Sequence, residues 1–387
     1  MNNIKNILIF GVTGQTGSWM TDYLLENTEH NIYGVVRRLS VKNHENIQHL
    51  EDNPRFHLLS GDLNDETSIK ECFDTCKPDY CINFAAQSFV GESWNSPVNT
   101  WNTNSTALIK ILEVIRKDYP NCRMGNAGSS EEWGNVVYSP QNEAHPPMPR
   151  SVYGASKCAA RNIIKVYRES YNLYALQWWG TNHESERRGI EFVTRKITDG
   201  VAKIYHSIKN KDFKFEPILL GGYNQTRDWS HAYDFCDGIW KILNQENYRK
   251  DIDNHFSIAK NLGTFNYIEQ KALVPQLKEY VLSSNESHSI REFLELAFDN
   301  ADIKYVWHGE NENEELLLSN DGKLATKSYI PLVKINSKFY RPADVVNLYG
   351  DSNLIRQELG WNPKISFKEL VKIMVENDIK KYEKLNP

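Results

Sequence analysis

Close to its start, this chain passes from an apolar stretch directly into a turn built on three evenly spaced glycines. The stretch Ile7-Leu-Ile-Phe10 has the composition of a buried strand, and it leads into Gly11-Val-Thr-Gly14-Gln-Thr-Gly17. Residues 18–25 then follow helical periodicity. Glycines at this spacing let the backbone approach a pyrophosphate, which would rest on the N–H groups at the helix N-terminus. The opening segment therefore predicts a dinucleotide-binding strand–turn–helix unit.

Strand-like and helix-like segments alternate beyond this unit, as far as the run Leu176-Gln-Trp-Trp179. Such alternation is typical of an α/β fold with a doubly wound parallel sheet of the Rossmann type. A chain of 387 residues with 40% hydrophobic content can bury a core of that size and still supply a second, smaller lobe. The predicted strands after the first are Asn31–Val36, Phe56–Ser60, Tyr80–Phe84 and Arg123–Ala127.

The C-terminal part of the chain predicts a smaller mixed α/β lobe. Helical patterns cover residues 287–298, 353–359 and 366–381. Residues 311–324 have the composition of an acidic loop.

Composition narrows the class of protein. The formal net charge of −5 shows no basic excess, which argues against nucleic-acid binding as the main function. The first apolar run begins at Ile7, which leaves no room for a signal peptide, and no stretch reaches the length of a membrane span. The six cysteines include no Cys-x-x-Cys pair, so we expect reduced thiols and neither a metal site nor a disulfide. These features predict a soluble cytoplasmic protein.

A tyrosine and a lysine four residues apart, Tyr153 and Lys157, provide a candidate base and its charge partner. On a helix over residues 151–171 they lie on the same face. A free phenol has a pKa of about 10, and a nearby ammonium together with the positive charge of an oxidised nicotinamide would lower it toward neutrality. The pair could also lie on a solvated helix face.

The segment Ser129-Ser130-Glu131 lies one loop upstream of that helix. It follows a predicted strand, and open parallel sheets bind their ligands at the carboxyl ends of strands. A hydroxyl and a carboxylate at this place strengthen the interpretation of Tyr153 as a base. The alternative is a loop that only ends a strand.

Segments after the other predicted strands could bind the adenine, the 2′-phosphate and the nicotinamide of a dinucleotide. The second strand ends in Arg37-Arg38, where NAD-binding folds place an acidic residue, so the pair favours the 2′-phosphate of NADP over NAD unless it is an exposed basic turn. Asp62 follows the third strand and either accepts from an adenine amino group or forms a turn. Small residues in Ala85-Ala86-Gln87-Ser88 would let the nicotinamide pass close to the backbone.

Charged and amide side chains crowd the segment Asn182-His-Glu-Ser-Glu-Arg-Arg-Gly189 and continue in Phe192-Val-Thr-Arg-Lys196. Two further segments, Arg227-Asp-Trp229 and Arg341-Pro-Ala343, add arginines. These groups supply the planar forks and amides that suit a diphosphate and a nucleobase. In a sequence without the preceding motifs they would indicate a solvated surface.

Together these segments resemble the GDP-mannose 4,6-dehydratases of the extended short-chain dehydrogenase/reductase superfamily, and the resemblance covers nearly the whole chain. The combination is more specific than a glycine turn alone. The matching segments are Gly11–Gly17, Arg37-Arg38, Ala86–Ser88, Asn182–Ser185, Arg187–Gly189, Phe192–Lys196, Arg227–Trp229, Ser287–Phe293, Arg341–Ala343 and Leu359–Trp361.

The resemblance implies conversion of GDP-mannose to its 4-keto-6-deoxy product. Tyr153 would take the C4 hydroxyl proton while hydride passes from C4 to NADP, and Lys157 would hold the nicotinamide ribose. Glu131 would remove the C5 proton, and Glu131 and Ser129 would assist the loss of water from C6. The hydride would return to C6, so the cofactor is regenerated.

The resemblance also implies two sets of binding residues and an oligomer. The cofactor set is Gly11, Thr13, Gly14, Gln15, Thr16, Gly17, Arg37, Asp62, Leu63, Ala86, Gln87, Ser88, Tyr153, Lys157, His183 and Arg188. The set for the GDP-sugar is Ser88, Ser130, Asn182, Val193, Lys196, Arg227 and Arg341. The oligomer would be a homodimer or homotetramer, with the segment after Arg38 near a neighbouring subunit.

It further implies a division of the chain into two parts. A dinucleotide-binding domain covers residues 1–180, with a return segment at 227–284. A sugar-nucleotide-binding lobe covers residues 181–226 and 285–387. Residues near 248–278 have no counterpart in the family and form a polar insert.

Some positions depart from the family pattern. Ser129 replaces a usual threonine but keeps the hydroxyl. We expect the departures to cluster near the sugar, so that GDP-manno-heptose is an alternative substrate. The other departures are Thr16 for aspartate, Phe89 for histidine, Asn99 for tyrosine, and Glu132-Trp133 and Trp178–Thr181 for apolar residues.

Two other kinds of protein remain open. A GDP-sugar 4-dehydrogenase or epimerase would use Tyr153 and Lys157 without needing Glu131. A nucleotide-sensing or scaffolding relative would have no activity, and the presence of Ser129 together with these three residues disfavours it.

Overall fold

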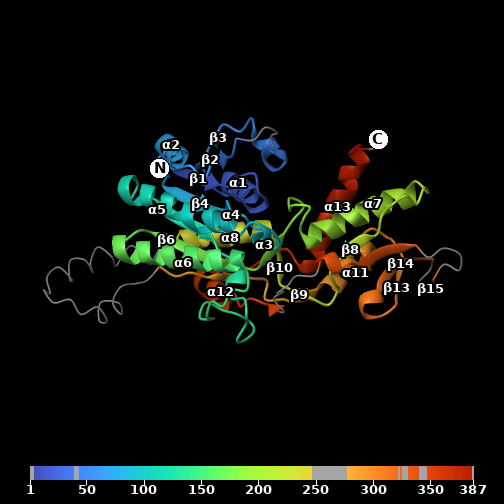
Figure 1. Ribbon diagram of the computed structural model, residues 1–387. Coiled ribbons are helices and arrows are strands. Elements are labelled where there is room, and N and C mark those ends of the chain that lie inside the picture. Colours follow the sequence, from blue (N-terminus) through green and yellow to red (C-terminus); the bar gives the residue numbers. More distant parts are fainter. Residues whose placement is uncertain are drawn as a thin grey trace.

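The computed structural model describes residues 4–38, 43–245, 277–320, 323–324, 330–339 and 347–385. The chain forms two lobes side by side, with the N-terminal strands in one lobe and the C-terminal helix α13 in the other (Figure 1). Nearly all of the insert expected near 248–278 lies outside the described residues, and so does Arg341.

The first lobe contains a seven-stranded sheet with the order β11-β6-β5-β4-β1-β2-β3, in which every neighbouring pair is parallel. The order reverses between β1 and β4, which is where doubly wound sheets bind ligands. The predicted Rossmann-type α/β fold is therefore confirmed. The strands are β1 (Asn6–Phe10), β2 (Asn31–Val36), β3 (Phe56–Ser60), β4 (Tyr80–Asn83), β5 (Arg123–Ala127), β6 (Ala175–Gly180) and β11 (Val281–Leu282).

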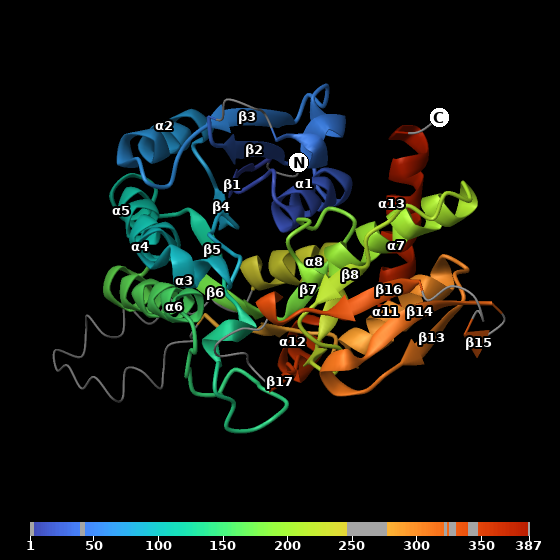
Figure 2. The same cartoon turned by 45° about the vertical axis from the view of Figure 1, so that its right-hand side comes forward.

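Helices cover both faces of this sheet, as Figure 2 shows. Ile7 and Ile9 of β1 belong to the core under one layer of helices, and Leu8 and Phe10 belong to the core under the other. Because both faces are buried, the strand is apolar throughout instead of alternating. One layer comprises α1 (Gln15–Asn27), α8 (Ala232–Leu243) and α12 (Asn353–Leu359), and the other comprises α2 (Glu66–Cys76), α5 (Ala107–Asp118) and α6 (Val152–Tyr171).

A separate core holds the second lobe together. Its sheet has the order β13-β14-β16-β8, with β15 beside β14; β16 and β8 pair in parallel and the other strands are antiparallel. Three helices pack against one another there, and Phe293, Phe298 and Leu370 are fully buried between them and the sheet. The elements are α7 (Val193–Lys209), α11 (Ile290–Asn300), α13 (Phe367–Leu385), β8 (Ile218–Leu220), β13 (Tyr305–His308), β14 (Glu315–Asn320), β15 (Lys323–Leu324) and β16 (Pro331–Ile335).

Short elements complete the fold. The strand β7 pairs with β10, and β9 pairs with β12 and β17. The short strands are β7 (Asn182–Glu184), β9 (Thr226–Arg227), β10 (Trp229–His231), β12 (His288–Ser289) and β17 (Asn347–Leu348). The short helical turns are η1 (Glu45–Leu50), α3 (Glu92–Asn95), α4 (Pro97–Trp101), η2 (Asn102–Thr106), η3 (Ser130–Glu132), η5 (Asn311–Asn313) and η6 (Ser337–Phe339).

One expectation for the second lobe is wrong, because residues 311–324 do not form an acidic loop. Leu316 and Leu317 are buried, and β14 pairs with strands on both sides. The acidic residues gather before and at the start of this strand, where Glu314 pairs with Arg291 at 2.6 Å. Charges at one end of the segment therefore concealed a buried strand.

The three helices predicted in the C-terminal part of the chain are present, with one shifted start, and one of them, α12, packs in the core of the first lobe. Ser289, rather than Ser287, caps α11, since its Oγ accepts from the N–H of Glu292 at 3.1 Å. All six cysteines lie in the described ranges and are free thiols. Within those ranges, none of the helices combines the length and apolar composition that a membrane span needs.

Candidate active site

The turn after β5 brings a hydroxyl and two carboxylates to the carboxyl end of the sheet. The Oγ of Ser129 accepts from the N–H of Glu131 at 3.2 Å, and the N–H of Ser129 donates to Oε1 of Glu132 at 2.8 Å. This arrangement is a capping box, which satisfies backbone donors at a helix start. Glu132 is fully buried and Glu131 is partly exposed. Of the two carboxylates, Glu131 is therefore the accessible one.

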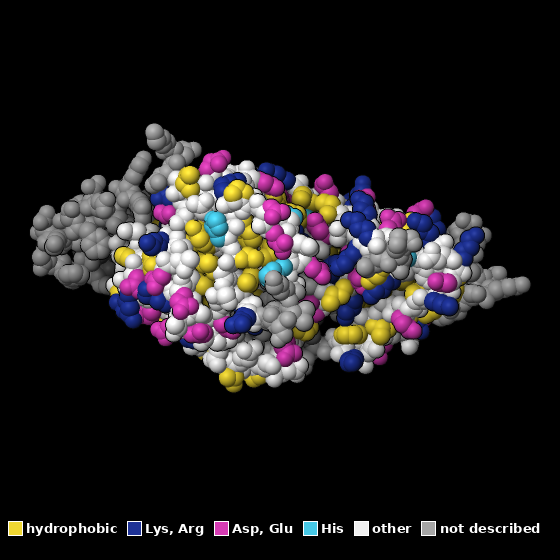
Figure 3. All heavy atoms as spheres, turned by 90° about the horizontal axis from the view of Figure 1, so that it is seen from above, with side chains coloured by type: hydrophobic (Ala, Val, Ile, Leu, Met, Phe, Trp, Pro, Cys, Tyr) yellow, Lys and Arg dark blue, Asp and Glu magenta, His cyan; other side chains and the backbone are white. Residues whose placement is uncertain are grey.

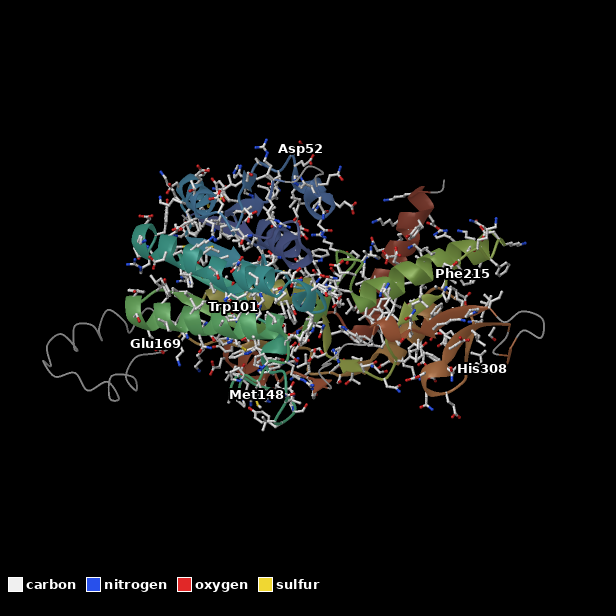
Figure 4. The ribbon with its side chains drawn as sticks, viewed as in Figure 1. Asp52, Trp101, Met148, Glu169, Phe215 and His308 are labelled. Atoms are coloured by element: carbon white, nitrogen blue, oxygen red, sulfur yellow. The ribbon has the colours of Figure 1, made fainter. Side chains whose placement is uncertain are left out.

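Helix α6 places Tyr153 beside this turn. Ser151 caps the helix, because its Oγ accepts from the N–H of Gly154 at 3.0 Å. A Cβ at Gly154 would lie 2.5 Å from the backbone oxygen of Glu131, so the close approach of helix and turn requires a glycine. The hydroxyl of Tyr153 hydrogen-bonds with Ser129. The structure thus brings Tyr153 of α6 together with Ser129 and Glu131 of the turn after β5. The loop between η3 and α6 carries Met148 (Figure 4).

The pKa values of the Tyr153 and Lys157 side chains are both shifted by burial. Burial raises the pKa of Tyr153 to about 12, the hydrogen bond with Ser129 opposes this shift, and the charge of Glu131 adds to it. Burial lowers the pKa of Lys157 to about 8, and the charge of Glu132 opposes this shift.

The ammonium of Lys157 is hydrogen-bonded to a backbone group. Its Nζ donates to the backbone oxygen of Ala127 at 2.7 Å and lies 5.8 Å from the ring centre of Tyr153. The lysine alone therefore does not lower the phenol pKa. The lowering expected from the sequence depends on the second positive charge, that of a nicotinamide.

Sequence analysis does not identify Asn104, which joins three parts of this region. Its Oδ1 accepts from the N–H of Gln87 at 2.9 Å, and its Nδ2 donates to the backbone oxygen of Gln87 at 3.1 Å and to Oγ of Ser156 at 3.0 Å. Asn104 lies in the π-helical turn η2, and such turns inside helices frequently mark functional sites. The sequence feature that could have identified Asn104 is the polar run of residues 102–106 next to the amphipathic helix α5.

The glycine turn has the close packing that a dinucleotide-binding loop requires. Gly11 has a φ of +81°, and a Cβ there would meet the backbone N of Ala85 at 2.7 Å. A Cβ at Gly17 would meet the oxygen of Gly11 at 2.3 Å. Gly14 is the N-cap residue of α1, and no side chain among the described residues caps that end. The residues present therefore fit a pyrophosphate at the first amides of α1.

Side chains of the glycine turn hold the segment where the second lobe begins. The Nε2 of Gln15 donates to the backbone oxygen of His183 at 2.8 Å, and Oγ1 of Thr16 lies 2.9 Å from Nε2 of the same histidine. Burial lowers the pKa of His183 to about 4, so its ring is neutral near pH 7. Arg188 pairs with the buried Glu184 at 3.1 Å. Hydrogen bonds thus connect the glycine turn to His183, and Arg188 is held by Glu184 in the same segment as that histidine. The residues of this region that were predicted to bind the cofactor are Gln15, Thr16, His183 and Arg188.

The other predicted cofactor residues follow the carboxyl ends of the strands. Gln87 is partly buried, and its Oε1 has no hydrogen-bond partner within the part of the chain that the structure describes. Asp62 forms a local turn, since its Oδ1 accepts from the N–H of Asn64 at 2.8 Å. The set comprises Thr13 after β1, the exposed Arg37 after β2, Asp62 and the buried Leu63 after β3, and Ala86, Gln87 and the exposed Ser88 after β4.

The residues predicted to hold the GDP part come from both lobes. The Nζ of Lys196 lies 3.8 Å from the ring centre of Phe339, and burial lowers the pKa of this lysine. Arg227 donates from Nη1 to the backbone oxygen of Thr226 at 2.8 Å. Lys and Arg side chains also gather over α7 and α13 on the face shown in Figure 3. Ser88 and Ser130 belong to the first lobe, Asn182 to β7, Val193 and Lys196 to α7, and Arg227 to β9, while Arg341 lies outside the described residues.

The positions that depart from the family pattern do not gather in one place, contrary to our expectation. Trp178 belongs to the core of the large sheet, and Asn99 is exposed on α4. Phe89 packs edge-on against Phe192 at 5.9 Å between ring centres. Consecutive strand residues point to opposite faces of a sheet, so neighbours in sequence do not share one environment.

Comparisons with known proteins agree with this geometry. The family model described as GDP-mannose 4,6 dehydratase matches residues 8–277 and 266–374. The GDP-mannose 4,6 dehydratase of Drosophila melanogaster is 36% identical over 391 residues, which cover 99% of this chain and 88% of that protein.

Two solved structures share the fold. The dTDP-glucose 4,6-dehydratase of Bacillus anthracis in complex with NAD has a TM-score of 0.72 at 18% identity and covers 98% of both chains. The RMD of Pseudomonas aeruginosa complexed with NADPH has a TM-score of 0.68 at 17% identity, and the match covers 97% of this chain and 99% of that one.

Proposed function

Because this chain belongs to the GDP-mannose 4,6-dehydratase family, it is a GDP-sugar 4,6-dehydratase, and we propose that it converts GDP-mannose or GDP-manno-heptose with NADP as its cofactor. The reaction removes one water and makes the protein a lyase. The observation that carries the proposal is the position of Glu131 beside Tyr153 at the end of β5. A simple dehydrogenase or epimerase needs the tyrosine but no such carboxylate.

We assign the oxidation of C4 to Tyr153. Its phenolate takes the proton of the C4 hydroxyl, and Ser129 holds the phenol oxygen by the hydrogen bond that favours its charged form. A bound nicotinamide would supply the hydride chemistry between C4 and C6, and its positive charge would favour the phenolate of Tyr153. The buried ammonium of Lys157 is fixed on the oxygen of Ala127, from where it can hold the ribose.

We assign the loss of water to Glu131 and Ser129. Glu131 takes the C5 proton, which is acidic because C5 adjoins the C4 ketone. The same proton then reaches the C6 hydroxyl, which leaves as water and gives a C5–C6 double bond. C5 regains a proton at the end of the reaction, and this proton is balanced by the one that Tyr153 took from the C4 hydroxyl. The net change is therefore the loss of one water.

The preference for NADP rests on the end of β2. Arg37 is exposed there, and a guanidinium suits a 2′-phosphate, whereas NAD-specific folds place a carboxylate at this position. Calorimetric titration with NADP and with NAD tests this preference. We expect tighter binding of NADP, and an equal or stronger affinity for NAD would contradict it.

A homodimer or homotetramer is supported by the outer layer of the first lobe. Val98 is 70% exposed, Val166 is 57% exposed and Trp101 is 43% exposed (Figure 4). Exposed apolar side chains on one layer favour contact with a second copy of the chain. Light scattering during gel filtration measures the assembly, and a monomeric mass at micromolar concentration would contradict it.

Incubation with GDP-mannose and with GDP-manno-heptose tests the function. We expect mass spectrometry to show the loss of one water from at least one of these sugars, with no net change in NADPH. Retention of water together with a change of configuration at C4 would indicate an epimerase. Retention of water with stoichiometric formation of NADPH would indicate a dehydrogenase.

A further inference from the structure

Behind the turn η3 lies a group of four charged side chains that the proposed mechanism does not use. Arg161 pairs with Glu132 at 2.7 Å and with Glu279 at 2.5 Å, and Arg168 pairs with Glu279 at 3.0 Å. The side chain of Glu132 is 1% exposed and those of the other three are 12–15% exposed. Two carboxylates thus balance two guanidinium groups, as the burial of ions requires.

Glu132 is the member of this group that touches the site. Its Oε1 accepts from the N–H of Ser129 at 2.8 Å, from Nη2 of Arg161 at 3.1 Å and from Nε2 of Gln177 at 3.1 Å. The same Nε2 of Gln177 donates to the backbone oxygen of Lys157 at 2.9 Å. One carboxylate therefore joins the backbone of Ser129 to that of Lys157.

The surroundings leave this carboxylate little room to move. A Cβ at Gly128 would lie 2.7 Å from Oε1 of Glu132 and 2.1 Å from the backbone oxygen of Trp178. The guanidinium of Arg161 lies 3.4 Å from the ring centre of Trp179. Because Arg161 is held both by Trp179 and by Glu279, it cannot follow a displaced carboxylate.

We propose that Glu132 is a positioning residue for the elimination of water: held by Arg161, it fixes the N–H of Ser129 and thereby the turn that carries Glu131. A charge-assisted hydrogen bond in a dry interior is strong and directional enough for this role. Glu132 touches no reacting atom, since it is buried behind the turn. The inference rests on the proposed function, in which Ser129 and Glu131 act on C5 and C6.

The test compares Glu132→Gln with Glu143→Gln, a control that changes a carboxylate outside the group around Arg161, which accepts from the backbone N–H of Val281 at 2.9 Å. A small misplacement of reacting groups costs about 10- to 100-fold in rate, so we expect kcat of Glu132→Gln to fall by that factor. The KM for the GDP-sugar should stay within about twofold, because ground-state binding is not affected. The control should keep kcat within about twofold of the wild-type value.

A second measurement separates the two halves of the reaction. In a single turnover, we expect Glu132→Gln to slow the incorporation of solvent deuterium at C5 more than it slows the formation of reduced nicotinamide. A merely structural defect would slow both equally. Equal slowing of the two halves, or an unchanged kcat, overturns the inference.

If Glu132→Gln does not fold, the double variant Glu132→Leu/Arg161→Leu tests whether Glu132 is a positioning residue. It removes both charges together, which buried ion pairs tolerate better than the loss of one partner. The same selective loss of elimination supports the proposal, and full activity overturns it. A wild-type protein that removes no water from either GDP-sugar overturns the proposed function itself, and this inference with it.

Discussion

The two sides of the candidate site are built differently. On the first-lobe side, Ser129 and Lys157 are buried, and the side chain of each is hydrogen-bonded to a backbone group. On the second-lobe side, Lys196 and Arg227 are partly exposed cations on a helix and a short strand. In the proposed mechanism, the first side sets the places of the reacting atoms, and the second side supplies positive charge. We therefore expect substitutions on the first side to lower kcat and those on the second side to raise KM.

Replacing Tyr153 should give the largest effect. Tyr153→Phe keeps the buried ring but removes the base, and loss of a general base typically costs about 10²- to 10⁴-fold in rate. Steady-state kinetics should show this fall in kcat, and calorimetry should show unchanged binding of the GDP-sugar. A variant with normal kcat and raised KM would contradict the expected difference between the two sides.

Replacing Glu131 separates the dehydratase from its alternatives. Glu131→Gln should slow the loss of water by about 10²- to 10³-fold while C4 oxidation continues, so reduced nicotinamide should build up on the protein. Absorbance of the reduced ring and mass spectrometry of the product measure the two steps. Near-normal turnover would indicate a dehydrogenase or epimerase instead.

The buried ammonium of Lys157 should make folding stability depend on pH. Its pKa is about 8 in the folded protein against an ordinary value of 10.5, so between these values the unfolded chain binds more protons. Stability should therefore rise with pH across this window, by on the order of 3 kcal/mol relative to Lys157→Met. Urea unfolding of both proteins at several pH values measures the difference. A constant difference across the window would show that the ammonium is well solvated.

The smallest effect should come from the second lobe. Lys196→Met should raise KM for the GDP-sugar about tenfold and leave kcat within about twofold, because the lost charge acts equally on ground state and transition state. Lys203→Met is the matched control, since this exposed lysine of the same helix pairs with Asp199. A fall in kcat for Lys196→Met would indicate that this lysine acts on the reacting groups, and it would contradict the expected difference between the two sides.

Local sequence patterns predict most of the fold and part of the candidate site. The glycine turn and the Tyr153–Lys157 pair are short-range features, in which spacing alone sets geometry. The partners of Glu132, which accepts from the N–H of Ser129, are partly long-range: Arg161 and Gln177 reach Glu132 across 29 and 45 residues. No local periodicity encodes such contacts, and Gln177 lies within a strand whose other residues are apolar or glycine.

Two features of the structure could not be predicted from the sequence. The acidic composition around Glu314 concealed the buried leucines of β14, because an average over a segment hides where its charges lie. The direction of the Tyr153 pKa depends on burial, which sequence spacing does not reveal.

The most direct measurement follows a deuterium atom placed at C4 of GDP-mannose. If Tyr153 and Glu131 act on adjacent carbons of one bound sugar, the product should lack one water and carry the deuterium at C6. Mass spectrometry and NMR read both features in the same sample. Loss of the deuterium to solvent, or a product that retains both the water and the label at C4, would contradict the mechanism.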